Sequence, residues 1–104
     1  MEQYDVRHSD PAIDDLADIL RHFLEVKKEP QIAMNLLDTI GENVGNLSTM
    51  PHRCPLVGDE FLASLGYRLL IVGNYNAFFT IDEGKRVVNI ERILYARRDW
   101  QNIL

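Results

Sequence analysis

The chain of 104 residues contains a single cysteine, Cys54, so it cannot form an internal disulfide. No apolar run reaches the roughly 18 residues of a membrane-spanning helix. The first residues also lack the basic and apolar segments of a signal peptide. We therefore expect a cytoplasmic protein with no membrane partner. Because 46% of the residues are hydrophobic, the chain can build one core, and we expect a single domain over residues 1–104.

Motifs for metals and cofactors are also missing. The three histidines, His8, His22 and His52, are scattered, without an HExxH motif or a cysteine pair beside them. There is no P-loop and no GxGxxG glycine motif. We expect neither a metal site nor a cofactor.

Positive charge is scarce and unevenly distributed. The 11 Lys and Arg against 16 Asp and Glu give a net charge of −5, which argues against a broad nucleic-acid-binding surface. Residues 1–66 carry 12 acidic and 5 basic side chains (−7), whereas residues 67–104 carry 4 acidic and 6 basic ones (+2). Residues 92–98 contain three arginines, whose planar forks are suited to phosphate. This distribution predicts a local site for a phosphate-bearing partner.

Apolar periodicity predicts one strand followed by two helices. Residues 3–8 alternate as in a strand, Ser9 and Pro11 are a helix start, and Pro30 opens a second helix. We interpret Gly41 and Gly45 as points of close contact between the helices. The predicted inner stripes are Ile13, Leu16, Ala17, Leu20 and Leu24 in the first helix and Ala33, Leu36, Leu37, Ile40, Val44 and Leu47 in the second.

The remaining residues predict a loop, three strands and a short tail. Prolines and glycines mark residues 51–66 as a loop. Residues 67–72, 75–81 and 86–95 read as strands, and their short links predict an antiparallel meander. Residues 99–104 are predicted to form a helical turn. The fold class is therefore α+β, with one four-stranded twisted sheet and a helical hairpin on one face.

Both faces of the predicted sheet are partly apolar, because Leu69 and Ile71 share one face while Leu70 and Val72 share the other. The helical hairpin accounts for one face. The second face is covered either by a partner polypeptide or by residues 51–66 and the C-terminal tail.

Five arginines and one tyrosine are the candidates for chemistry. Simple alternation places Arg92 on one face with Val88, Ile90 and Leu94, and Arg68 could share that face with Arg53 folded over it. The alternative is ion pairing of Arg92 with Glu91 or Glu60 and of the last arginines with Asp99 or the C-terminus, with Tyr95 a packed aromatic. The full candidate set is Arg53, Arg68, Arg92, Tyr95, Arg97 and Arg98.

A further pattern runs through nearly the whole chain and ends in a basic segment. Its residues are Tyr4, Val6, Ser9, Ala12, Asp15 and Leu16, then Pro30 and Ala33, then Leu47, Met50, Pro51 and Arg53, then Gly66, Tyr67, Arg68, Leu69 and Leu70, then Asn74, Tyr75, Phe79, Ile81 and Asp82, and last residues 92–100 with Ile103 and Leu104. In order and spacing this pattern resembles the RelE/ParE toxin family of type II toxin–antitoxin systems.

The resemblance implies a small toxin that a cognate antitoxin protein holds inactive. RelE-type members cleave mRNA on the ribosome, and ParE-type members poison DNA gyrase. By resemblance, Arg68 matches the arginine that family ribonucleases place on the scissile phosphate. Tyr95 takes a proton-transfer position, and Arg92 is the third catalytic candidate. Arg53, Arg97 and Arg98 would bind RNA or ribosome.

We therefore predict a toxin that blocks translation by ribosome-dependent mRNA cleavage. Two alternatives stay open: a non-enzymatic inhibitor of DNA gyrase, and a weakly active module that mainly binds its antitoxin. The acidic net charge differs from that of ribosome-dependent family members. The only candidate acid–base partners for Tyr95 are Glu91 and His52, neither clearly placed beside it.

Overall fold

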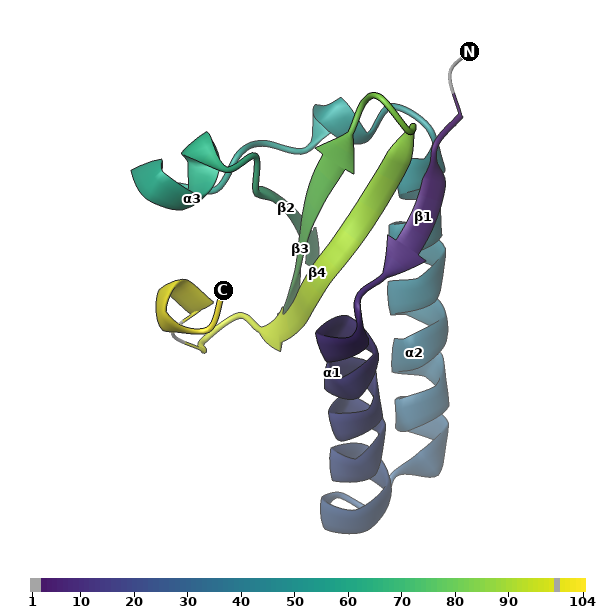
Figure 1. Ribbon diagram of the computed structural model, residues 1–104. Helices are drawn as coiled ribbons and strands as arrows, with labels where there is room; N and C mark the ends of the chain where they lie inside the picture. The colour runs from purple at the N-terminus through teal and green to yellow at the C-terminus, as the bar shows by residue number, and fades with distance from the viewer. Residues whose placement is uncertain (1–2, 99) are drawn as a thin grey trace.

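The computed structural model describes residues 3–98 and 100–104 (Figure 1). Its main elements are β1 (Asp5–His8), α1 (Asp10–Arg21), α2 (Pro30–Gly45), α3 (Glu60–Ser64), β2 (Arg68–Val72), β3 (Tyr75–Asp82) and β4 (Val87–Tyr95). A π-helical turn at His22–Val26 prolongs α1, and short 3-10 turns lie at Asn46–Ser48, Pro51–Arg53 and Trp100–Asn102. This order confirms the predicted strand, hairpin and meander.

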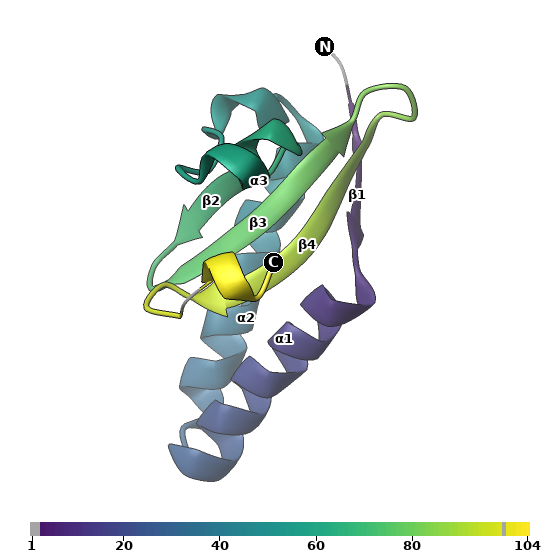
Figure 2. The ribbon, with the colours of Figure 1, turned by 60° about the vertical axis from the view of Figure 1, so that its left-hand side comes forward.

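The four strands form one sheet in the order β1-β4-β3-β2. Strands β2, β3 and β4 are antiparallel neighbours, and β1 pairs in parallel with β4. A parallel pair requires a long crossover, and the α1–α2 hairpin supplies it. The hairpin lies against one face of the sheet and extends beyond its end, whereas α3 and the C-terminal turn lie over the other face (Figures 1 and 2).

Both predicted helix starts are confirmed. The Ser9 hydroxyl accepts a hydrogen bond from the Ala12 N–H at 3.1 Å, and Pro11 occupies the first turn of α1. Pro30 begins α2. At both helix starts, a capping side chain or a proline accounts for backbone N–H groups that have no acceptor within the helix.

The predicted inner stripe of α1 was wrong in part: Leu16 packs against the hydrophobic core, but other members of the stripe are exposed. The buried residues of α1 are Ala12, Asp15 and Ile19, while Ile13 is 52% exposed and Leu24 is 41% exposed. The cause is Asp15, whose carboxylate faces β4, so the inner face of the helix includes a charged position that an apolar stripe does not reveal.

The α2 stripe is confirmed, because Ala33, Ile40 and Val44 are buried together with Leu47 just after the helix. The interpretation of Gly41 and Gly45 was wrong. Both glycines are exposed, and a Cβ at either position would meet no atom within 4 Å.

Two hydrophobic clusters lie on opposite faces of the sheet. The hairpin-side cluster includes Phe79, Ile90 and Ile93 with residues of α1 and α2. The outer cluster combines Phe78 and Leu94 with side chains from both covering segments: Val57, Leu62, Ala63, Trp100, Ile103 and Leu104. Residues 51–66 and the C-terminal tail therefore pack on the second face, as one of the two alternatives predicted. Residues 51–66 were predicted as loop only, but they contain α3, which Asp59 caps by accepting the Leu62 N–H at 2.9 Å.

A register shift divides β4. Phe79 pairs with Ile90 and Phe78 pairs with Arg92, so Glu91 is an extra residue in β4, as in a β-bulge. Consequently Ile90 packs on the hairpin side, whereas Leu94 packs in the outer cluster. The predicted common face was wrong for Val88 and Ile90, because the bulge breaks the alternation, whereas Arg92 and Leu94 do share a face.

Candidate interaction site

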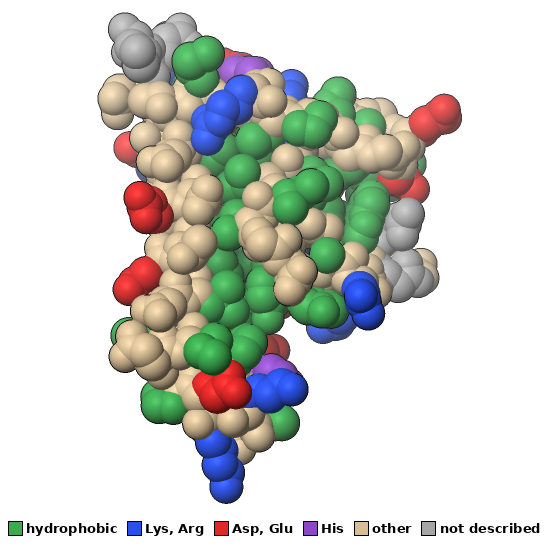
Figure 3. Space-filling model, turned by 180° about the vertical axis from the view of Figure 1, so that it is seen from behind, with side chains coloured by type: hydrophobic (Ala, Val, Ile, Leu, Met, Phe, Trp, Pro, Cys, Tyr) green, Lys and Arg blue, Asp and Glu red, His purple; other side chains and the backbone are tan. Residues whose placement is uncertain are grey.

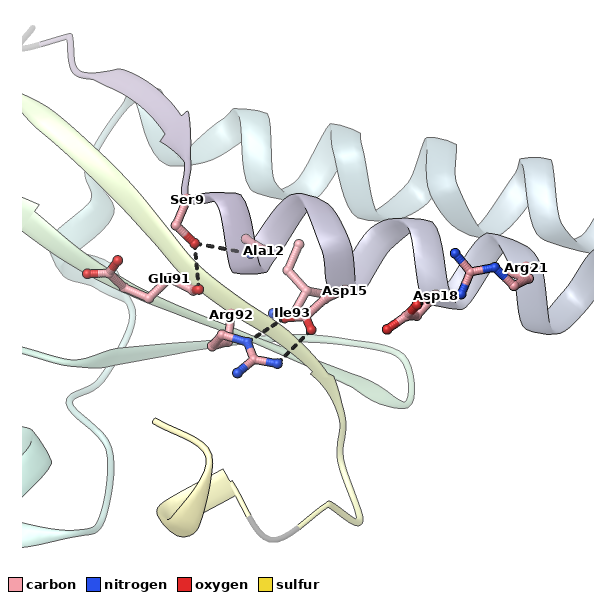
Figure 4. A network of polar contacts seen from close by, with 8 residues as sticks. All are labelled: Ser9, Ala12, Asp15, Asp18, Arg21, Glu91, Arg92 and Ile93. Carbon is pink, nitrogen blue, oxygen red and sulfur yellow. Dashed lines mark hydrogen bonds and ion pairs between the residues drawn. The ribbon is translucent and has the colours of Figure 1, made fainter.

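The Arg92 guanidinium forms a bidentate ion pair with Asp15 (Figure 4). Arg92 Nη2 donates to Asp15 Oδ1 at 2.7 Å, and Arg92 Nε donates to Asp15 Oδ2 at 2.8 Å. These hydrogen bonds raise the pKa of Arg92, with burial opposing them and the charges of Asp15 and Asp14 adding to them. Glu91 and Glu60 were predicted as possible ion-pair partners of Arg92, and this was wrong. The partner is Asp15, an acidic residue on α1.

The Asp15 carboxylate also binds the backbone at the uncovered edge of β4. β1 ends where His8 pairs with Ile90, so β4 continues beyond it, and no strand of the described residues lies on that side. Asp15 Oδ2 accepts the Ile93 N–H at 2.9 Å. Ser9 binds the two preceding backbone carbonyls of β4: its N–H donates to the Ile90 carbonyl at 2.9 Å, and its hydroxyl donates to the Glu91 carbonyl at 2.7 Å. Ser9 and Asp15 thus satisfy the polar groups that a strand would otherwise pair.

Arg53 and Arg68 bind backbone carbonyls near one end of the sheet. Arg68 Nη1 donates to the Cys54 carbonyl at 2.7 Å and to the His52 carbonyl at 3.4 Å. Arg53 Nη1 donates to the carbonyls of Thr49 at 2.9 Å and of Met50 at 3.1 Å. Both guanidinium groups therefore hold the segment that leads from α2 to α3.

Arg68 and Arg92 lie on opposite faces of the sheet, contrary to the expectation of a shared face. Arg68 pairs with Phe79 and Arg92 pairs with Phe78, and neighbouring residues of a strand point to opposite faces. Glu91 and His52, the candidate acid–base partners, are engaged elsewhere. Thr80 donates to Glu91 at 3.2 Å, and His52 Nε2 lies 2.5 Å from Glu83 Oε1.

A groove of about 580 Å³ lies at the other end of the sheet, between α1 and the end of β4. We call it the basic groove. The Tyr75 and Tyr95 rings meet edge to face in it, with their centroids 5.6 Å apart. Burial, and after it the neighbouring Tyr95, raises the pKa of Tyr75. The lining residues are Asp15, Asp18, Ile19, His22, Phe23, Lys27, Asn74, Tyr75, Ile93, Leu94, Tyr95 and Arg98.

The charge of this groove is positive once its ion pairs are considered. Asp15 is neutralised by Arg92, and Asp18 lies 2.8 Å from Arg21. Lys27 and Arg98 form no ion pair with any residue that the structure describes. Seen from behind, apolar side chains form a band between α2 and the sheet, and Lys, Arg and His side chains lie at its lower end together with acidic ones (Figure 3).

Sequence reasoning identified part of this groove. Tyr95 and Arg98 were candidates, and Arg97 is exposed on the same segment. We call residues 95–98 the C-terminal arm. Possible pairing of the arm with Asp99 falls on a residue outside those described. The groove residues of the π-helical turn, His22 and Phe23, were missed, because only the fold brings this turn to β4. Within the described residues, no group of three or more His, Cys, Asp or Glu is placed to hold a metal ion.

Comparison with known structures defines the class of this fold as RelE/ParE-like. The structure superposes on a chain of the chromosomal ParDE toxin–antitoxin system from P. aeruginosa with a TM-score of 0.75 and 22% identity, covering 91% of this chain and 98% of that one. For a chain of the RelBE2 toxin–antitoxin complex from Mycobacterium tuberculosis, the TM-score is 0.65, the identity 25%, and the coverage 91% and 93%.

The family described as "ParE toxin of type II toxin-antitoxin system, parDE" matches residues 6–100. The chain belongs to this family and is a toxin of a type II toxin–antitoxin system. No curated protein matches it significantly. No helix among the described residues has the length and apolar character needed to cross a membrane.

Proposed function

We propose that this toxin inhibits DNA gyrase by surface contact, through the basic groove and the C-terminal arm, without cleaving RNA. One observation carries the proposal: the three catalytic candidates are apart. Arg92 is bound to Asp15, Arg68 is bound to backbone carbonyls, and Tyr95 lies at the far end of the sheet from Arg68.

RNA cleavage by attack of the ribose hydroxyl needs a proton acceptor, a proton donor and cations around one phosphate. Such groups must lie within about 3 Å of the atoms they serve. Among the described residues that line the basic groove, the two free cations are Lys27 and Arg98, and the exposed aromatic rings are those of Tyr95 and His22. Tyrosine and arginine are the side chains that most often dominate protein–protein binding energy. The presence of Tyr95 and Arg98 in one groove therefore favours a binding surface.

The toxin should be tested on gyrase directly, with purified protein. We expect wild-type toxin to inhibit supercoiling of plasmid DNA, and we expect Arg98→Ala and Tyr95→Ala each to raise the half-inhibitory concentration about tenfold or more. Lys85→Ala is the matched control, because it removes one exposed positive charge at the turn between β3 and β4, away from the groove. No inhibition of gyrase by folded wild-type toxin would refute the proposed target.

Ribosome-dependent mRNA cleavage is the second candidate, which the 25% identity to a RelBE2 complex chain favours. It makes a different prediction. In a translation extract, the toxin would generate mRNA 5′ ends in phase with codons, and Arg68→Ala and Tyr95→Phe would abolish them. Intact transcripts together with inhibited gyrase would support the first candidate over the second.

The cognate antitoxin is the partner that both similar structures contain in their own complexes. For this chain we propose that acidic antitoxin residues bind over Lys27 and Arg98. The expected sign is weaker binding at higher salt, since exposed charge pairs are screened. Calorimetry at two salt concentrations, with Lys85→Ala again as the control for Arg98→Ala, measures the groove's share of the affinity.

A further inference from the structure

The Asp15–Arg92 ion pair lies just before the start of the C-terminal arm. Asp15 lies in the middle of α1, and Arg92 precedes Tyr95 by three residues on β4. Figure 4 shows the Arg92 side chain reaching from β4 to the Asp15 carboxylate on α1. The contact joins residues 77 positions apart, so it fixes the helix to this end of the sheet.

Both oxygens of the Asp15 carboxylate accept hydrogen bonds in this pair. One carboxylate accepts three N–H groups: Arg92 Nη2, Arg92 Nε and the Ile93 backbone. The side chains of Asp15 and Arg92 are only 9% and 23% exposed, so water substitutes poorly for either partner. An asparagine at position 15 keeps the shape but offers one acceptor oxygen, and its NH₂ group would face a donor.

Backbone hydrogen bonds fix the position of the C-terminal arm after β4. The Ala96 N–H donates to the Asn74 carbonyl at 2.8 Å, and the Arg98 N–H donates to the Tyr95 carbonyl at 2.9 Å. Asn74 lies in the turn between β2 and β3, and it lines the basic groove together with Asp15. The groove is therefore bounded by α1 on one side and by β4, the arm and this turn on the other, and the Asp15–Arg92 pair bridges the two sides.

We propose that Asp15 is a positioning residue for target binding, which holds the C-terminal arm in register with α1 through Arg92 and the Ile93 N–H. Asp15 itself contributes no charge to the partner, because Arg92 neutralises it. Its role is to set the distance between Tyr95 and Arg98 on the arm and Lys27 after α1. This inference rests on the proposed function only in assuming that the groove and the arm contact the target.

The test compares Asp15→Asn with Asp38→Asn, which removes the same charge from an exposed site on α2 outside the groove. All measurements are made at a temperature where circular dichroism shows each variant fully folded. For Asp15→Asn we expect the half-inhibitory concentration against gyrase to rise about tenfold and hydrogen exchange of the Ile93 and Ala96 amides to accelerate about tenfold. Asp38→Asn should stay within about twofold of wild type in both.

Arg92→Lys provides a second variant if Asp15→Asn does not fold. Lysine keeps the charge but loses the bidentate fork. We expect the same loss of inhibition and the same faster exchange at Ala96, whereas amides in the middle of α2 exchange at the wild-type rate. Exchange at Ala96 that is unchanged in every folded variant would overturn the proposal, as would unchanged inhibition of gyrase.

The amide measurements separate this proposal from the proposed function. If wild-type toxin does not inhibit gyrase, the proposed target is wrong, but faster exchange in the arm of Asp15→Asn would still show that Asp15 positions it. If gyrase is inhibited and the arm exchanges normally in the variants, the positioning role is wrong while the target stands.

Discussion

Arg68 on β2 and Tyr95 on β4 pair with residues of β3 that lie four positions apart. Arg68 pairs with Phe79 of this strand, whereas Tyr95 pairs with Tyr75, four residues away. At about 3.3 Å per residue, the strand alone separates these pairs by roughly 13 Å. The Arg68 guanidinium is also directed to the Cys54 carbonyl, so the two side chains do not converge on one point, and this geometry favours separate roles for the two residues.

Arg68→Ala should therefore reduce stability more than activity. The variant loses the hydrogen bond to the Cys54 carbonyl, which joins the start of β2 to the preceding segment. We expect the free energy of unfolding to fall by about 1–3 kcal/mol in urea titrations. The inhibition of gyrase by the folded fraction should be unchanged. A folded Arg68→Ala protein without any toxicity would return Arg68 to the list of catalytic residues.

Phe78 should be among the most important residues for stability. It is fully buried in the outer cluster, and its ring centroid lies 5.1 Å from that of Trp100. Phe78→Ala should lower the free energy of unfolding by about 3–5 kcal/mol. Phe61→Ala is the matched control, because Phe61 is 69% exposed on α3. Its expected effect is below about 0.5 kcal/mol. Equal effects of the two substitutions in urea titrations would mean that the outer cluster is not a core.

Ser9→Ala should remove two contacts at once. The hydroxyl caps α1 through the Ala12 N–H and also donates to the Glu91 carbonyl on β4. We expect a loss of about 1–2 kcal/mol in the free energy of unfolding, measured by thermal or urea denaturation. Ser64→Ala, at the end of α3, serves as the comparison, and a similar loss there would argue against a special role for the Ser9 cap.

Burial of the Cys54 thiol predicts that the stability of the protein depends on pH. Cys54 is 6% exposed, and burial raises its pKa, although the charges of Arg53 and Arg68 partly offset this. The folded state thus keeps the thiol proton at a pH where the unfolded chain has lost it. Stability is complete below the ordinary thiol pKa of about 9 and falls as the pH rises through the folded-state value.

Urea titrations at about pH 8 and about pH 10 measure this effect. The free energy of unfolding should fall between them, and less so in Cys54→Ser. Half-buried Tyr67 and Tyr75, whose pKa values are also raised by burial, contribute the slope that stays in the variant. Native Cys54 should also react with iodoacetamide far more slowly than in urea. Equal slopes for wild type and variant, or rapid alkylation of the native protein, would contradict the assigned burial.

Much of the fold was predictable because its signals are local. The Ser9 cap, the prolines at the helix starts and the short turns between the last three strands each act within a few residues. The apolar residues on both faces of the predicted strands also anticipated two clusters, which Phe78 and Phe79 enter from adjacent positions of β3. Local hydrogen bonding and periodicity carry this kind of information.

The site was less predictable because it depends on contacts between distant parts of the chain. Nothing near Asp15 in the sequence indicates that it faces inward, since its partner lies 77 positions away. The extra residue Glu91 in β4 likewise has no local signal, and it reverses the faces of Arg92 and Leu94 relative to simple alternation. These two features separated residues that had seemed to share a face.

By itself, the sequence determined the first strand, the helical hairpin, the three-stranded meander, their order and the family to which the toxin belongs, because caps, turns and periodicity act over short distances. Only the tertiary structure decided which arginines are engaged and which are free. The partners of Arg92 and Arg68 are chosen by strand register and helix orientation, and both arise only when the whole core packs.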